Sequence, residues 1–226
     1  MLVVKMLNTI YDDYSLDRIE INLKENESLI YFNLDRNASD VVINLATNSN
    51  LKYYQISLEE ANTKLEVNLN GENASFEGNT LTILNNNTSK YNQNIVHNAK
   101  RTVSKIKNFG IVLDNANIDY HTVGKINKGM SGSNCNQTSR GVIIGNSASV
   151  TSQPILLIDE YDVFANHGAA IGKMSDDELF YLMSRGLNKK EALMLIIKGL
   201  INPIIDVLDD KYKEIYHNKI DELIKD

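Results

Sequence analysis

The sequence predicts a mainly β protein, a parallel β-helix (β-solenoid) followed by a smaller α-helical domain. Short segments rich in apolar and β-branched residues fill the first three quarters of the chain, and clusters of Asn, Asp and Gly separate them, as strands and turns require. Two of these segments repeat imperfectly, and helical patterning becomes strong only after residue 175. A β-sandwich would also contain short strands, but imperfect repeats of strand and turn favour a solenoid.

The predicted strands include residues 29–32, 41–45 and 65–69, which are apolar or alternate between apolar and polar side chains. We divide the β part into a degenerate N-terminal region, residues 1–60, which leads into the solenoid, and a β-helix core, residues 61–170. The division reflects the weaker repeat character of the first sixty residues.

The repeats are the main argument for stacked coils. Residues 111–116 resemble residues 142–147, which follow 31 positions later. A second echo relates residues 74–78 to residues 120–124, because both end in glycine. In a solenoid each coil covers the edge of its neighbour, so related segments recur along the chain.

The C-terminal domain, residues 171–226, begins with a capping signal. Ser175 is followed three residues later by Glu178, the pattern of a capping box, and Gly186 is the expected C-terminal stop of this first helix.

A second helix is capped by Asn188, with Glu191 three residues on, and a third helix spans about residues 211–225. Pro203 marks a break or kink in the second helix. Its apolar residues at helical spacing are Ala192, Leu195, Ile196, Leu200 and Ile204.

Charge and composition exclude several classes of function. The net charge of −6 argues against nucleic acid as the main partner, and no segment has the ~20 apolar residues that cross a bilayer. Residues 1–15 lack the features of a signal peptide, and the single cysteine cannot form an internal disulfide. We therefore expect a cytoplasmic protein without membrane contact.

Catalytic motifs are missing, so we predict that the chain is not an enzyme. Residues 168–173 depart from the Walker pattern in spacing and in the residue after lysine. Residues 129–132 are one position short of a Gly-x-Ser-x-Gly elbow, and no histidine pair has zinc-site spacing. His97 is expected to support a turn between coils.

An alternative function follows from the acidic cluster of Asp159, Glu160 and Asp162. On a β-solenoid, carboxylates of this kind serve enzymes that cleave acidic polysaccharides, by acid–base chemistry or by binding calcium. The simpler interpretation is a solvated turn between coils.

A series of motifs in the later part of the chain covers residues 143–156, 167–172, 179–182, 184–187 and 191–192. Taken in order, these motifs resemble the C-terminal signature of the SufB/SufD family of iron–sulfur cluster assembly proteins. Upstream, His97 with Thr102 and Ser104 also falls in family order, and the similarity extends over about residues 74–199.

The resemblance implies a right-handed parallel β-helix that pairs with a second β-helical subunit, as a homodimer or as a heterodimer with another SufB/SufD-like chain. It also implies that the C-terminal helices dock a SufC-like ABC ATPase, so that nucleotide is bound by the partner and not by this chain. Phe180, Tyr181 and Arg185, together with the apolar faces of the last helices, are the candidate docking residues, although the aromatics could instead hold the helices to the β-helix.

The cargo implied by the family is a transient iron–sulfur cluster, and His167 and Cys135 are the candidate ligands. His167 matches a family histidine near the proposed cluster site between paired subunits. Departures from the pattern are Ala165, where SufD-like chains have cysteine, Gly168, where SufB-like chains have an acidic residue, and Ser139, where the cluster-accepting cysteine is expected.

The number of ligands limits the mechanism. A typical cluster needs four protein ligands, mainly thiolates, and this chain contains one cysteine. A symmetric pair would supply Cys135 and His167 twice, and pairing with a more cysteine-rich relative is the other solution. Two roles therefore remain open, a divergent scaffold that holds cluster and a structural partner that only pairs and docks the ATPase.

Overall fold

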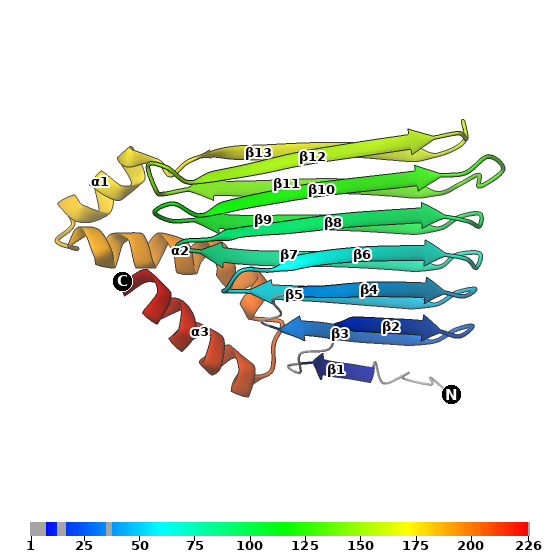
Figure 1. Ribbon diagram of the computed structural model, residues 1–226, viewed down its shortest axis with the longest axis horizontal. Coiled ribbons are helices and arrows are strands. Elements are labelled where there is room, and N and C mark those ends of the chain that lie inside the picture. The colour runs from blue at the N-terminus through cyan, green and yellow to red at the C-terminus, as the bar shows by residue number, and fades with distance from the viewer. Residues whose placement is uncertain (1–7, 13–16, 35–37, 226) are drawn as a thin grey trace.

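The chain forms a flattened parallel β-solenoid with three helices at one end (Figure 1). This computed structural model describes residues 8–12, 17–34 and 38–225. Most of residues 1–15, on which the expectation about a signal peptide rests, lies outside the described residues. The prediction of a parallel β-solenoid with a C-terminal helical part is confirmed.

The strands belong to two sheets, and every pairing between neighbours is parallel. Odd-numbered strands form one sheet, in the order β1 (Asn8–Asp12), β3 (Ser28–Leu34), β5 (Asn50–Ser57), β7 (Ser75–Leu84), β9 (Val103–Val112), β11 (Asn134–Ile143) and β13 (Phe164–Lys173). Even-numbered strands form the other, in the order β2 (Arg18–Leu23), β4 (Ala38–Leu45), β6 (Asn62–Leu69), β8 (Thr88–His97), β10 (Asn117–Ile126) and β12 (Ser149–Ile158). The chain alternates between the sheets, so each coil contributes one strand to each.

The register explains one sequence repeat and contradicts the other. Val142 pairs with Ile111 across β9 and β11, as the 31-residue echo predicted. The second echo is wrong, because Gly78 lies in β7 and Gly124 in β10, strands of different sheets. Asn26 and Asn48 occupy equivalent positions in neighbouring coils and are 22 residues apart in the sequence. The spacing between equivalent positions is larger in later coils, with 25 residues from Asn48 to Asn73 and 28 from Asn73 to Arg101.

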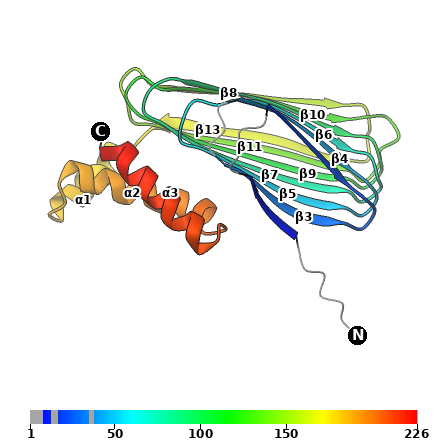
Figure 2. The same ribbon diagram turned by 60° about the horizontal axis from the view of Figure 1, so that its bottom comes forward.

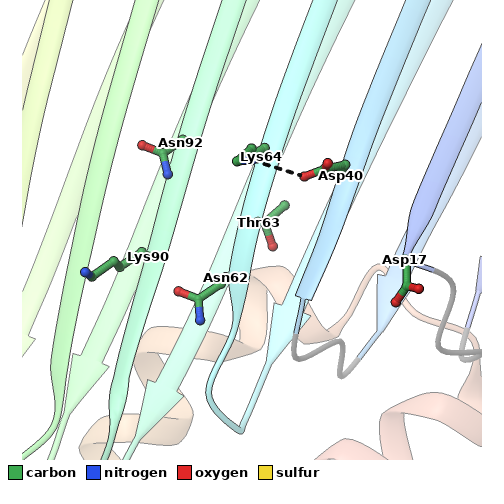
Figure 3. Close-up of a pocket in the computed structure, with 7 residues that line it drawn as sticks. All are labelled: Asp17, Asp40, Asn62, Thr63, Lys64, Lys90 and Asn92. Atoms are coloured by element: carbon green, nitrogen blue, oxygen red, sulfur yellow. Dashed lines mark ion pairs between the residues drawn. The ribbon is translucent and has the colours of Figure 1, made fainter.

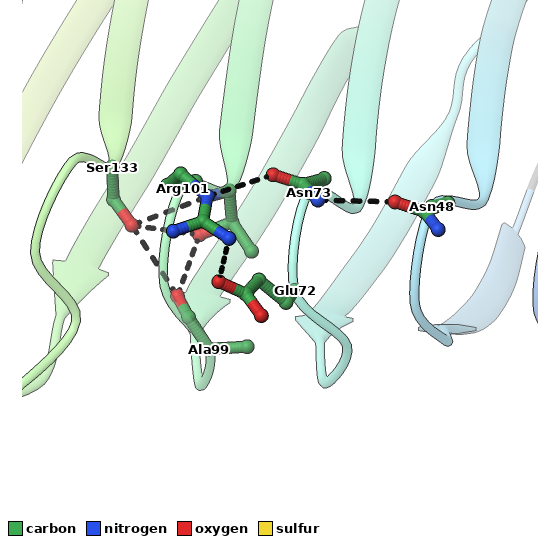
Figure 4. Close-up of polar contacts among 7 residues, drawn as sticks. Asn48, Glu72, Asn73, Ala99, Arg101 and Ser133 are labelled. Carbon is green, nitrogen blue, oxygen red and sulfur yellow. Dashed lines mark hydrogen bonds and ion pairs between the residues drawn. The ribbon is translucent and has the colours of Figure 1, made fainter.

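A turn ladder of side chains runs along the end of the solenoid that lies away from the helices (Figure 4). Asn26, Asn48, Asn73 and Arg101 occupy equivalent positions with positive φ of 61°, 55°, 58° and 55°. Asparagine tolerates this left-handed conformation better than most residues. Each side chain bonds to the preceding one, with Asn73 Nδ2 donating to Asn48 Oδ1 at 3.0 Å and Arg101 Nε donating to Asn73 Oδ1 at 3.1 Å.

Side chains that point between the two sheets form the interior. One apolar cluster fills the early coils around Ile43, Leu51 and Phe76, and another fills the later coils around Tyr91 and Tyr120. Between them lies a buried polar network in which Asn108 Nδ2 donates to Gln93 Oε1 at 2.9 Å. Buried polar groups of this kind need partners to offset their lost hydration.

The first two helices begin where their capping residues predict, and the third begins one residue before its predicted start. α1 (Asp176–Ser184) has Ser175 as N-cap, α2 (Lys189–Ile205) has a complete capping box from Asn188 and Glu191, and α3 spans Asp210–Lys225. Gly186 has φ of +100° just after α1, as expected of a stop signal. Pro203 lies inside α2, two residues before its end.

The helices α2 and α3 cover the outer face of the odd-strand sheet at one end of the strands (Figure 2). Ile197, Ile201 and Ile205 of α2 pack against sheet residues such as Phe109 and Ile111. Leu195, which the sequence placed among the apolar residues of α2, is 53% exposed and lies outside this contact. The buried centre of the contact with the sheet is formed by isoleucines spaced four residues apart, and not by every apolar residue of α2.

A stack of aromatic rings fastens α3 to the sheet. Tyr212 stacks on Tyr11 with ring centroids 4.5 Å apart, Tyr11 on Phe32 at 4.6 Å, and Phe32 on Tyr54 at 4.9 Å. The backbone N–H of Asp209 also donates to the Tyr11 hydroxyl at 2.9 Å. These contacts join residues nearly two hundred positions apart and hold the helices on the solenoid.

Candidate functional site

The last coil, β12 and β13, is open to solvent on the side where a further coil would stack. In β13 all side chains except that of Ala165 are exposed, whereas β11 alternates between buried and exposed positions. Within the described chain, β13 pairs only with β11 and β12 only with β10. Both sheets therefore end in an unpaired strand edge, and β13 adds the exposed Phe164 and Ile171.

His167 lies on β13, and Cys135 lies on β11. His167 pairs with Gln137, while Cys135 pairs with Ala165, two positions earlier. Cys135 and Gln137 are buried alternate residues, and side chains of paired residues in parallel strands share a face. His167 and Cys135 are therefore diagonal neighbours on the inward side of the sheet. The structure brings the two predicted ligands onto adjacent strands, but it exposes only His167.

The thiol of Cys135 is enclosed. The residue is 1% exposed, and a Cβ added to Gly124 on the opposite sheet would lie 2.5 Å from its Sγ and 2.7 Å from Gln137 Nε2. Burial raises the pKa of the Cys135 thiol, and a hydrogen bond with Ser104 acts in the opposite direction. In this closed arrangement the thiol is poorly placed to bind a metal ion from solution.

A hydrogen-bonded chain connects Cys135 to His97. Ser104 is the shared neighbour, because it bonds to Cys135 and its Oγ lies 2.9 Å from His97 Nε2. His97 Nδ1 lies 2.7 Å from Thr102 Oγ1, which donates to the carbonyl oxygen of Ala99 at 3.1 Å. His97 is thus a buried, fully bonded imidazole at a turn, as the sequence predicted, and burial lowers its pKa to about 4.

Two positions where the family pattern places a cysteine or an acidic residue hold small residues in the same region. Ser139, at the cysteine position, is buried and pairs with Ala169 of β13, and its Oγ accepts a hydrogen bond from Ser152 Oγ at 2.8 Å. Gly168 lies on the exposed part of β13, where a Cβ would meet no atom within 4 Å. The departures therefore lie on the inner and outer surfaces of the last coils, close to His167.

One copy of the chain does not offer a complete set of ligands for an iron–sulfur cluster. In the part of the chain that the structure describes, no group of three or more His, Cys, Asp or Glu side chains is arranged to hold a metal ion. Four ligands are typical of a cluster, and one copy offers at most the exposed His167 and the enclosed Cys135.

The candidate docking residues lie on α1, which buries none of its side chains. Phe180 is 73% exposed and Tyr181 57% exposed. The Arg185 guanidinium lies over the Tyr181 ring at 5.2 Å and donates to its hydroxyl at 3.5 Å. These side chains are available to a partner, and they do not hold the appendage to the solenoid.

Next to α1, an apolar hollow of about 440 Å³ extends this surface onto α2. Leu187, Met194 and Leu195 line it, with Lys190 and Lys198 at its margin. The sequence placed Leu195 on the apolar face of α2, and the apolar faces of the last helices were among the candidate docking surfaces. α2 contains more apolar residues than a single face of the helix can bury against the sheet, and this surplus was the sequence signal that could have identified the exposed surface.

The acidic cluster has a structural role in the turn before β13. The Glu160 carboxylate accepts backbone hydrogen bonds from Gly129 at 2.8 Å and from Tyr161 at 2.9 Å. The hydrogen bond from Gly129 is the largest of the influences that lower the pKa of Glu160. Because its oxygens bind the turn, this carboxylate is not free for the acid–base chemistry of the polysaccharide alternative.

Another hollow, of about 340 Å³, lies on the outer face of the even-strand sheet (Figure 3). Asp40 and Lys64 face one another there at 4.0 Å, with Asp17 and Lys90 nearby. It contains none of the predicted site residues. No described helix is both long and apolar enough to cross a membrane.

Fold and site together define a parallel β-solenoid protein with an open last coil and an exposed helical appendage. The family model described as SUF system FeS cluster assembly, SufBD core domain, matches residues 6–200. The chain therefore belongs to the SufBD family, as the sequence motifs indicated.

Several curated proteins are similar to parts of this chain. The iron–sulfur cluster assembly protein SufD of Bacillus subtilis (strain 168) is 38% identical over 121 residues, which cover 54% of this chain and 28% of that protein. The SufD protein of Escherichia coli (strain K12) is 28% identical over 144 residues, covering 63% and 34%, respectively. The SufD protein of Plasmodium berghei is 28% identical over 187 residues, covering 80% and 14%. The matches thus span about a third or less of these relatives.

Proposed function

We propose that this chain is a non-enzymatic subunit of an iron–sulfur cluster assembly complex. It pairs through the open end of its solenoid and docks a SufC-like ABC ATPase through its C-terminal helices. The observation that carries the proposal is the pair of uncovered surfaces, the β12–β13 coil and the α1–α2 face, in a chain of the SufBD family. The names of the relatives support the assembly role.

Pairing is supported by the edge of β13. A ten-residue strand with an unpaired edge offers backbone donors and acceptors to a second strand. Phe164, Ile155 and Leu157 add exposed apolar surface to the last coil. The partner is a second copy or another SufB/SufD-like chain, and either would cover the inward side of β13, where His167 lies.

For the cargo cluster, we propose His167 as the accessible ligand and Cys135 as a second ligand that requires opening of the last coil. Pairing of two copies would bring two imidazoles and two thiols to one interface, which equals the four ligands a cluster needs. If Cys135 stays enclosed, the chain acts instead as a structural partner of a cysteine-rich subunit.

ATPase docking is tested by co-purification of the chain with a SufC-like ABC ATPase from the same organism. We expect Phe180→Ala, Tyr181→Ala and Arg185→Ala to weaken the complex about tenfold or more, as loss of exposed aromatic and arginine anchors does at interfaces. Tyr161→Ala, a fully exposed aromatic at the far end of the solenoid, is the matched control. Equal binding by all variants would refute the docking assignment.

Cluster handling is tested by anaerobic reconstitution with iron and sulfide, with and without the ATPase, for wild type, Cys135→Ala and His167→Ala. A visible absorption band on the paired species that both substitutions abolish supports a divergent scaffold. A stable complex with the ATPase but no band in any sample makes the chain a structural partner. Failure of both pairing and docking would contradict the proposed function as a whole.

A further inference from the structure

The strand β13 covers a buried thiol and is itself held along one edge only. Its ten residues pair with β11 along one edge only, and its side chains are exposed except that of Ala165. Gly168, Ala169, Ala170 and Gly172 contribute little apolar surface to packing. Segments with few buried contacts open with a smaller free energy than the rest of a protein.

Below β13, Cys135 is enclosed by a small number of neighbours. Ala165 is its register partner in β13, Ser104 its register partner in β9. Gly124 and Leu156 lie across from it on the opposite sheet. Ala165 is therefore the only register neighbour on the side of the open end, and departure of β13 would leave the thiol facing solvent from that side.

A second group under β13 is also incompletely satisfied. Gln137, the register partner of His167, is 2% exposed, and its Oε1 has no hydrogen-bond partner. Its Nε2 lies beside the Cys135 thiol. An unpaired buried acceptor costs free energy in the closed state, so opening of the last coil hydrates a group that the closed state leaves unpaired.

From this arrangement we propose that β13 is a cover strand, which leaves β11 reversibly and exposes Cys135 and Gln137 while the other coils stay folded. The opening gives a reagent or a cargo metal access to the only thiol of the chain. Its use in cluster handling rests on the proposed function, but the opening itself is measured without iron, ATPase or partner.

The experiment follows modification of Cys135 by iodoacetamide in the full-length chain under native conditions, as a function of urea concentration. The chain contains one cysteine, so labelling reports a single site. Opening of one strand exposes little surface, so we expect labelling to depend much less on urea than global unfolding does. Amide exchange should be faster in residues 164–173 than in residues 134–143.

Two substitutions separate local opening from global unfolding. Gly168→Thr places a β-branched residue beside Thr138 on the exposed face, where a Cβ meets no atom within 4 Å, and should slow labelling about fivefold by raising strand propensity. Ile43→Val weakens the distant, fully buried core of β4 and should leave the labelling rate unchanged within about twofold, although it lowers global stability.

Three results would overturn the proposal. The first is labelling with the full urea dependence of global unfolding. The second is a rate that rises with Ile43→Val, by about fivefold, and does not respond to Gly168→Thr. The third is fast amide exchange in β13 without labelling of Cys135, which would mean that other residues keep the thiol covered. None of these results bears on docking of the ATPase, so the two proposals fail separately.

Discussion

The coil of β8 and β9 and the last coil, β12 and β13, have the same parallel backbone but differ in what their side chains contact. In the inner coil the inward side chains are buried, because another coil lies on each side. In the last coil the inward side chains of β13 are exposed except at Ala165, and those of β12 are mostly half-buried. Parallel hydrogen bonding therefore propagates to the end of the solenoid, while burial stops one coil earlier.

The position of a coil in the stack therefore decides which side chains are buried and stabilise the fold, and which remain exposed to solvent or to a partner. His97 and His167 illustrate it, since the first is enclosed by Thr102 and Ser104 and the second is exposed. The same comparison separates Cys135, one coil below the open end, from the positions of the last coil. The following predictions test this contrast, from the largest expected effect to the smallest.

The largest effect is expected from a matched pair of phenylalanines. Phe76 is 1% exposed in the core of the early coils, and Phe164 is 76% exposed in the last coil. Phe76→Ala should lower the free energy of unfolding by about 3–5 kcal/mol, because it leaves a cavity. Phe164→Ala should change it by less than about 0.5 kcal/mol. Urea denaturation of both variants measures the difference, and similar losses would contradict the contrast between the coils.

The second effect concerns pH and His97. Burial lowers its pKa in the folded chain from 6.5 to about 4, so between these values the unfolded chain binds a proton that the folded chain does not. The contribution of His97 to the free energy of unfolding is therefore fully present above pH 6.5. As the pH falls from 6.5 to 4, the free energy of unfolding decreases by about 3 kcal/mol through this group.

His97→Gln retains hydrogen-bonding groups without a titrating imidazole, so its stability should fall less between pH 7 and pH 4.5 than that of wild type. Urea denaturation at several pH values measures the two profiles. The same substitution at the exposed His167 controls for the loss of an imidazole as such. Parallel profiles for wild type and His97→Gln would show that His97 is not the group responsible.

A smaller effect is expected from a pair of glycines. A Cβ at Gly124 would lie 2.5 Å from Cys135 Sγ, whereas a Cβ at Gly168 would meet no atom within 4 Å. Gly124→Ala should destabilise the chain by about 1–3 kcal/mol through overpacking, and Gly168→Ala should be neutral or slightly stabilising. Thermal unfolding of the two variants compares them, and equal transition temperatures would show that the penultimate coil accommodates the methyl group.

The smallest effect concerns the turn ladder. Arg101 occupies a left-handed conformation in which asparagine stands in the three preceding coils. This conformation costs about 1–2 kcal/mol for a residue such as arginine, whereas the short polar side chain of asparagine hydrogen-bonds locally and tolerates it better. Arg101→Asn should raise stability by about 0.5 kcal/mol, because loss of the exposed ion pair with Glu72 offsets part of the gain. Asn73→Ala, which interrupts the ladder, should act in the opposite direction in the same denaturation assay.

Of the two sequence repeats that predicted the solenoid, one corresponds to paired strands in the structure and the other does not. The change in coil length explains why repeats are hard to recognise in this sequence. Coil length increases along the chain, since Asn73 follows Asn48 by 25 positions, Arg101 follows Asn73 by 28, and Ser133 follows Thr102 by 31. A changing period leaves little trace in a single sequence. The echo that ended at Gly78 and Gly124 compared strands of different sheets.

For the candidate site, the sequence identified the residues but not their accessibility. His167, Cys135, Phe180, Tyr181 and Arg185 could all be chosen from motifs, whereas the enclosure of Cys135 depends on Gly124 and Leu156, which approach it from the opposite sheet. For α2, the sequence indicated apolar residues at helical spacing but not which of them meet the sheet, where Ile201 is buried and Leu195 is exposed. A helix with apolar residues on several faces does not reveal which face meets the sheet.

By itself, the sequence determined the parts of this protein that depend on neighbours along the chain. Ser175 and Asn188 specify helix starts because their side chains bond to backbone N–H groups three residues on, and alternating apolar residues specify strands. Only the tertiary structure decided the coil register, the cover over Cys135 and the open face of β13. These depend on residues brought together across the solenoid, because burial is a property of the stacked coils and not of any one strand.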